Sequence, residues 1–194
     1  DVSFWQDMLN EQDTMMFIYA SLHDFTKALD FEDILKMTTI FHKIENPQSK
    51  LIELTQIMSD FYEFEHKDKQ TFMIASSLCN IGKLTLGKDL LEKVDDLDIY
   101  EIEKIKTYPY YTKKILQNII GFADIASWAI KVQERLDGSG YISALSAKDL
   151  NFKDRLLQTL NAYNAIRQDR VYRELFSHDE AIEILKFEAS ENRF

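Results

Sequence analysis

The chain is short of the residues that turn a backbone, with only 5 glycines and 2 prolines among its 194 residues. An all-β protein of this length needs many more turn residues, so the shortage favours helices. Its one cysteine, Cys79, excludes an internal disulfide and fits a reducing compartment. No apolar run approaches the ~20 residues that span a bilayer, and no secretory signal is visible. We therefore expect an all-α, cytoplasmic domain.

Positive charge is also scarce, because 23 Lys and Arg face 33 Asp and Glu, for a formal net charge of −10. A surface this acidic repels a phosphate backbone, so we expect no nucleic-acid partner. A small anionic ligand could still bind in a locally basic pocket. The sequence also begins at Asp1 without Met, so we expect the cytoplasmic part of a longer protein.

The first 30 residues carry a regular apolar pattern. Alternating steps of four and three residues connect Phe4, Met8, Glu11, Met15, Ile18, Leu22, Phe25 and Leu29. This is the spacing of a coiled-coil seam, and it predicts a long helix that forms a homodimer or relays a signal from a neighbouring domain. The alternative is a helix packed on its own domain, whose stripe looks similar over a short run. We place an N-terminal helical segment at residues 1–46 and a second domain at residues 47–194.

From Gln48 onward, apolar stripes at helical spacing succeed one another, and two helix starts are well marked. Asp98 with Glu101, and Ser177 with Glu180, have the spacing of a capping box. These patterns predict a bundle of amphipathic helices.

Four segments of this second domain carry a family resemblance. They are Ile81-Gly82-Lys83, Thr107-Tyr108-Pro109, the run from Glu134 to Tyr141, and Asp169 to Arg173 with Ser177 to Ala181. In this order the segments resemble the HD-GYP domain, the bacterial fold that normally hydrolyses cyclic di-GMP, over roughly Gln48 to Leu185. The resemblance implies an HD-superfamily helical bundle that holds a cluster of iron or manganese ions between its helices.

The resemblance also shows where this sequence departs from the family pattern. The positions expected to hold the metal ligands carry Gln48, Cys79, Asn80, Tyr108, Val132, Gln133 and Asn161. Amides are weak ligands, valine has no donor atom, a tyrosine would need deprotonation, and one thiolate does not make a site. We therefore predict no metal cofactor, no catalytic residue and no enzymatic activity.

Other family positions are kept. By resemblance, the candidate ligand-binding residues are Lys83, Arg135, Asp137, Gly140, Tyr141 and Arg170. Two of these features have a purely structural alternative: Asp137 to Tyr141 can be a helix-ending turn that the fold needs, and Arg170 can tie the last helices together through ion pairs. The remaining histidines, His23, His42, His66 and His178, offer no anchored catalytic arrangement, and we expect His23 and His42 at the surface.

Three functions remain open. The favoured one is an inactive signalling or protein-interaction module in a cyclic di-GMP pathway, with a protein partner or neighbouring domain. The second is a receptor that binds cyclic di-GMP without a metal, through charge-assisted contacts to phosphate. The third is a phosphodiesterase with a rebuilt metal site.

Overall fold

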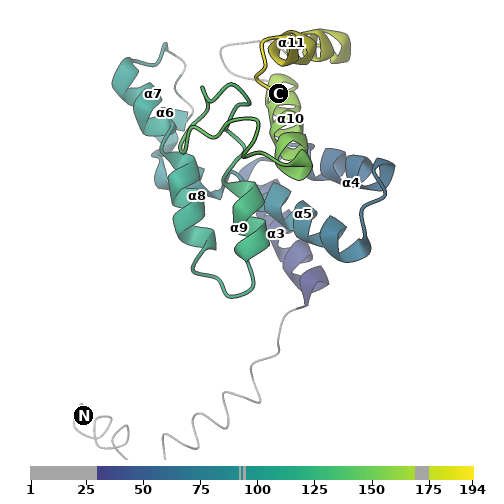
Figure 1. The fold of residues 1–194 in the computed structure, drawn as a ribbon. Coiled ribbons are helices and arrows are strands. Elements are labelled where there is room, and N and C mark those ends of the chain that lie inside the picture. The colour runs from purple at the N-terminus through teal and green to yellow at the C-terminus, as the bar shows by residue number, and fades with distance from the viewer. Residues whose placement is uncertain (1–29, 92, 94, 169–174) are drawn as a thin grey trace, which may run out of the picture.

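The computed structural model describes residues 30–91, 93, 95–168 and 175–194, and this part of the chain is helical, without a strand (Figure 1). The elements are α3 (Phe31–Glu45), α4 (Leu51–Phe61), α5 (His66–Leu78), the 3-10 helix η1 (Ile81–Thr85), α6 (Lys88–Leu91), α7 (Ile99–Ile105), α8 (Tyr108–Leu116), α9 (Ala123–Ala129), α10 (Phe152–Ile166) and α11 (His178–Ser190). The all-α helical bundle is therefore confirmed.

Helix α5 is the centre of the bundle, because α3, α4 and α9 all pack against it. Every residue from Thr71 to Leu78 is buried, and Phe72 and Ile74 are fully enclosed. The core continues through Leu116, Ile125 and Leu157, from α8, α9 and α10. A helix buried on all sides shows little amphipathic pattern, which is why its neighbours are easier to recognise in the sequence.

Both predicted capping boxes are present. The side chain of Asp98 accepts from the backbone N–H of Glu101 at the start of α7, and Ser177 accepts from that of Glu180 at the start of α11. A third box, in which Asn151 accepts from the N–H of Asp154, begins α10. This box was not predicted from the sequence, because the third residue of the helix is Asp rather than Glu or Gln.

The first described helix, α3, is part of the packed body. Phe31, Ile34, Leu35 and Phe41 lie against the hydrophobic core. The heptad pattern of residues 1–29 lies outside the described residues, so the coiled coil, the homodimer and the division of the chain after residue 46 stay predictions. No described helix is long and apolar enough to cross a membrane.

Candidate ligand-binding pocket

Four separated segments of the chain meet around a cavity of about 720 Å³. The cavity is in the size range of small-molecule sites. Its polar lining is rich in neutral amides, namely Asn46, Asn80, Gln133, Asn161, Asn164 and Gln168. Lys83, Lys93, Asp95, Asp96, Tyr108 and Tyr141 add charged and phenolic groups, and Leu90, Leu91, Leu97, Ile102 and Ile105 make an apolar side from α6, α7 and the chain between them.

The 3-10 helix η1 is held tightly against α8. A Cβ atom on Gly82 would lie 2.0 Å from the carbonyl oxygen of Tyr108 and 2.6 Å from the backbone nitrogen of Thr112, so only glycine fits. The backbone N–H of Gly82 donates to Thr112 Oγ1 at 3.0 Å. This close approach fixes Lys83, the next residue, beside Tyr108.

Tyr108, predicted by the resemblance to replace a histidine ligand, is a buried phenol. Its side chain is only 1% exposed, and its Oη accepts a hydrogen bond from Gln133 Nε2 at 2.9 Å. Burial raises the pKa of Tyr108 well above its usual value. The ammonium of Lys83 lies 5.1 Å from the centre of the Tyr108 ring, within the range of a cation–π contact.

The loop from Gln133 to Tyr141 is shaped by a buried carboxylate. Glu134 is 2% exposed, and its two oxygens accept from the backbone N–H groups of Ser143 and Leu145, both at 2.8 Å. A Cβ on Gly140 would lie 2.4 Å from Glu134 Cα, so this position also requires glycine. Glu134 is thus a positioning residue that holds the loop carrying Tyr141 against the pocket, and the sequence reading did not single it out.

The structure brings some predicted site residues together and separates others. Lys83 and Tyr141 line the pocket. Four residues that were predicted to stand in place of metal ligands line it too: Asn80, Tyr108, Gln133 and Asn161. Asn80 Nδ2 donates to Asn161 Oδ1 at 3.1 Å.

Three other candidates lie elsewhere. Arg135 lines a neighbouring, smaller cavity, with its guanidinium 4.7 Å from the centre of the Phe194 ring. Asp137 is taken up in a turn, where its Oδ1 accepts from the N–H and the hydroxyl of Ser139. Gly140 serves the close packing on Glu134, and Arg170 lies outside the described residues.

The other three residues that were predicted to stand in place of metal ligands lie outside this pocket. Val132 is buried in the core, and the buried Cys79 donates its thiol to the Ser76 carbonyl at 3.2 Å. Gln48 is exposed beside a third cavity. These three residues do not line the 720 Å³ pocket.

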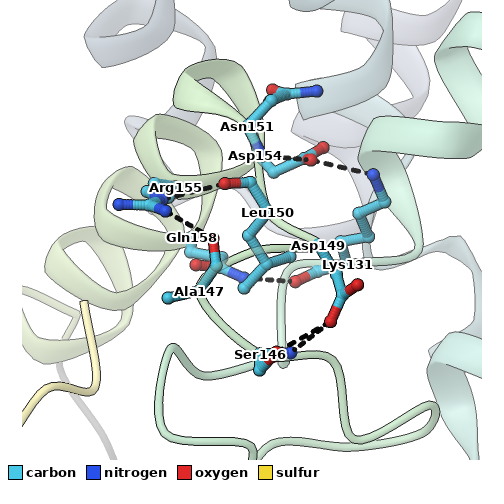
Figure 2. Close-up of polar contacts among 9 residues, drawn as sticks. All are labelled: Lys131, Ser146, Ala147, Asp149, Leu150, Asn151, Asp154, Arg155 and Gln158. Carbon is cyan, nitrogen blue, oxygen red and sulfur yellow. Dashed lines mark hydrogen bonds and ion pairs between the residues drawn. The ribbon is translucent and has the colours of Figure 1, made fainter.

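A second polar cluster lies at the start of α10, as Figure 2 shows. Lys131 Nζ donates to Asp154 Oδ2 at 2.8 Å, and Gln158 Nε2 donates to the Lys131 carbonyl at 2.9 Å. Both Asp154 and Gln158 are buried, and Asp154 Oδ1 and Gln158 Oε1 have no hydrogen-bond partner among the described residues. We call Lys131, Asp154 and Gln158 the closed cluster. It ties the end of α9 to α10.

His42 corrects one prediction. It was expected at the surface, but it is 3% exposed, and its Nε2 lies 2.8 Å from Ser49 Oγ. Asn164 Nδ2 donates to the same hydroxyl at 3.2 Å, and Asn164 Oδ1 accepts from the backbone N–H of Lys50 at 2.9 Å. The histidine is buried because α3 packs on the body of the domain instead of standing apart from it. Desolvation lowers the pKa of His42.

The sequence pattern of the HD domain matches residues 31–194, from the first described helix to the last residue. This chain belongs to the HD domain family. Its similar proteins include the 3′3′-cGAMP-specific phosphodiesterase 1 of Vibrio cholerae, 25% identical over 174 residues, which are 86% of this chain and 40% of that protein. The cyclic di-GMP phosphodiesterase PdeB of Borreliella burgdorferi is 30% identical over 110 residues, or 56% of this chain and 29% of that protein. The resemblance to an HD-GYP-type domain is thereby confirmed.

These relatives also correct a prediction. The statement that this HD domain is not an enzyme is wrong on these findings, because the similar proteins are phosphodiesterases. The prediction rested on the residues at the positions that the resemblance assigned to metal ligands, and such replacements alone do not exclude hydrolysis. The chain spans less than half the length of each of these relatives.

The residues at the positions that the resemblance assigned to metal ligands do not fit an iron or manganese cluster. In the pocket they are the amides of Asn80, Gln133 and Asn161 and the neutral phenol of Tyr108. Within the described ranges, no group of three or more His, Cys, Asp or Glu is placed to hold a metal ion. We therefore assign no catalytic step to a metal in this HD domain.

Several pocket residues escaped the sequence reading. Gln168 follows α10, Lys93 lies between α6 and α7, and the apolar side comes from a stretch without a family motif. A weak signal was available for the amides, because Asn161, Asn164 and Gln168 recur at steps of three and four residues, the spacing of one helix face.

Proposed function

We propose that this HD domain binds a cyclic dinucleotide in the 720 Å³ pocket. The observation that carries the proposal is the convergence of Asn80, Lys83, Tyr108, Gln133, Tyr141 and Asn161 from four separated segments on one cavity. The named relatives act on cyclic di-GMP or 3′3′-cGAMP, which supports this class of ligand.

Lys83 is the residue placed to contact a phosphate. It is a cation that lines the pocket, and its ammonium lies 5.1 Å from the centre of the Tyr108 ring. A charge-assisted hydrogen bond from an ammonium to a phosphate oxygen is about twice as strong as a neutral one. Tyr141, from the loop held by Glu134, adds a neutral hydroxyl, because burial raises its pKa.

The test is a calorimetric titration with cyclic di-GMP and with 3′3′-cGAMP, first with a chelator and then with manganese, with the products separated by chromatography. We expect saturable binding in the chelator. Lys83→Ala should weaken it about tenfold, the size of one lost charge-assisted hydrogen bond. Lys36→Ala is the matched control, because Lys36 is exposed on α3, pairs with Glu32 and does not line the pocket.

The titration and the product analysis test binding and hydrolysis separately. A folded protein that takes up neither dinucleotide under either condition contradicts the proposal. Linear dinucleotide among the products would add turnover to binding, and the manganese dependence of that product would show whether a metal takes part.

A further inference from the structure

The pocket holds buried polar atoms that nothing in the described protein satisfies. Asn80 Oδ1 and Gln168 Nε2 are enclosed and have no hydrogen-bond partner, and both side chains line the cavity. Gln168 is only 8% exposed. Buried polar groups in proteins are nearly always paired, so an acceptor and a donor left over in one cavity indicate the groups that a ligand brings.

The orientation of Asn80 is set by its neighbours. Its Nδ2 donates to Asn161 Oδ1 at 3.1 Å and lies 3.5 Å from Cys79 Sγ, which leaves Oδ1 as the acceptor of the pair. Asn164, which follows Asn161 by three residues on α10, instead has both its Nδ2 and its Oδ1 hydrogen-bonded, to Ser49 and Lys50. We call Asn80, Asn164 and Gln168 the amide wall. Asn164 has a structural role in it, whereas Asn80 and Gln168 each keep a polar atom without a partner among the described residues.

The charged residues of the pocket do not by themselves explain how it would bind an anionic ligand. Lys93 Nζ is bonded to both carboxylate oxygens of Glu101, at 2.8 and 2.7 Å, and Asp95 and Asp96 also line the cavity. Acidic side chains oppose the approach of a phosphate. The neutral lining must contribute to recognition beyond what Lys83 supplies.

We propose that this pocket recognises a nucleobase, with the amides of Asn80 and Gln168 at the edge of the ring and the leucines and isoleucines of the α6–α7 side against its face. A base has apolar faces and an edge that carries both donors and acceptors, which is the complement of one apolar wall and one amide wall. This inference rests on the proposed function and specifies how the same pocket selects its ligand.

The experiment separates the base from the phosphate. The folded domain is titrated with guanosine, with ribose 5-phosphate and with cyclic di-GMP, in chelator, and binding is followed by ligand-observed NMR and calorimetry. We expect guanosine to bind, more weakly than cyclic di-GMP because it is smaller, and ribose 5-phosphate not to bind measurably. Gln168→Leu should weaken guanosine and cyclic di-GMP about tenfold each, the effect of one lost hydrogen bond to a buried donor.

The matched control is Gln56→Leu, the same chemical change on the exposed face of α4. Binding of cyclic di-GMP without guanosine, or guanosine binding that Gln168→Leu leaves unchanged, would overturn the base inference and keep the proposed function. Failure of all three compounds to bind a folded protein in chelator would overturn the base inference, and it would overturn the proposed function itself if neither cyclic di-GMP nor 3′3′-cGAMP bound with manganese either.

Discussion

Two polar clusters use the residues of α10 and of the turn after it, and each contains buried polar atoms that lack a hydrogen-bond partner among the described residues. In the closed cluster these are Asp154 Oδ1 and Gln158 Oε1; in the amide wall they are Asn80 Oδ1 and Gln168 Nε2. The difference is what surrounds them. The closed cluster contains an ion pair between Asp154 and Lys131, and neither Asp154 nor Gln158 lines the 720 Å³ cavity.

The amide wall is neutral and faces a cavity large enough for a ligand. The unpaired atoms of the closed cluster lie beside an ion pair that joins two helices, whereas those of the amide wall belong to side chains that line a cavity. We therefore expect changes in the closed cluster to alter mainly the stability of the domain, and changes around the pocket to cost less stability and to alter binding.

The largest stability effect should come from Asp154→Ala. It leaves the ammonium of Lys131 without its carboxylate partner, and Lys131 has only 16% of its side chain exposed. Breaking a buried pair from one side costs about 3 kcal/mol of unfolding free energy, to be measured by urea denaturation. Asp149→Ala should cost less, because this carboxylate is exposed and accepts hydrogen bonds from Ser146 of the same turn.

A double variant sharpens that result. Lys131→Met with Asp154→Leu removes both charges and should recover most of the loss, because well-packed apolar residues can replace a buried ion pair. If the double variant were as unstable as Asp154→Ala, packing rather than the unpaired charge would explain the loss.

The next effect concerns pH and the buried His42, whose partner Ser49 is bonded to the pocket residue Asn164. Because the pKa of His42 is lowered in the folded domain, the unfolded chain binds more protons once the pH falls below its ordinary value of 6.5. The contribution of His42 to stability is therefore complete above that pH and is lost as the pH falls below it. Urea denaturation between about pH 7 and pH 5 should show this loss.

His42→Gln is the comparison for that measurement. It is expected to lower stability at every pH but to remove the part of the slope that begins near 6.5, because glutamine does not titrate. The same slope in both proteins would assign the pH dependence to other groups.

The smallest effect is expected for Tyr108→Phe. The change removes the hydroxyl that accepts from Gln133 but keeps the ring beneath Lys83. It should cost about 1 kcal/mol, the net value of one hydrogen bond, in the same denaturation assay. Tyr110→Phe, on the exposed side of α8, is the control and should change nothing measurable. A loss as large as that of Asp154→Ala would erase the distinction between the two clusters.

The parts of this fold that were predictable are local. The boxes at Asp98 and Ser177 join residues three positions apart, so each could be recognised in a short stretch of sequence. The segment motifs placed Lys83 and Tyr141 by family resemblance, and both line the pocket.

The missed features join distant residues. Asn164 and Lys50 are 114 positions apart, and Lys131 and Asp154 are 23 apart, so their pairing depends on how the helices pack. His42 was misplaced for the same reason: nothing within its own helix specifies that Ser49 and Asn164 will surround it. Arg135 kept its family position in the sequence, but its side chain stacks on Phe194, which no local pattern indicates.

The contact at Gly82 has a mechanical consequence. Its backbone lies so close to the carbonyl of Tyr108 and the backbone of Thr112 that a methyl group would not fit, so η1 and the first turn of α8 pack directly against each other. Lys83 belongs to η1 and Tyr108 begins α8, so this contact holds their backbones close together. We therefore expect this corner of the cavity to be more rigid than the rest, so that adjustment to a ligand comes mainly from the other walls.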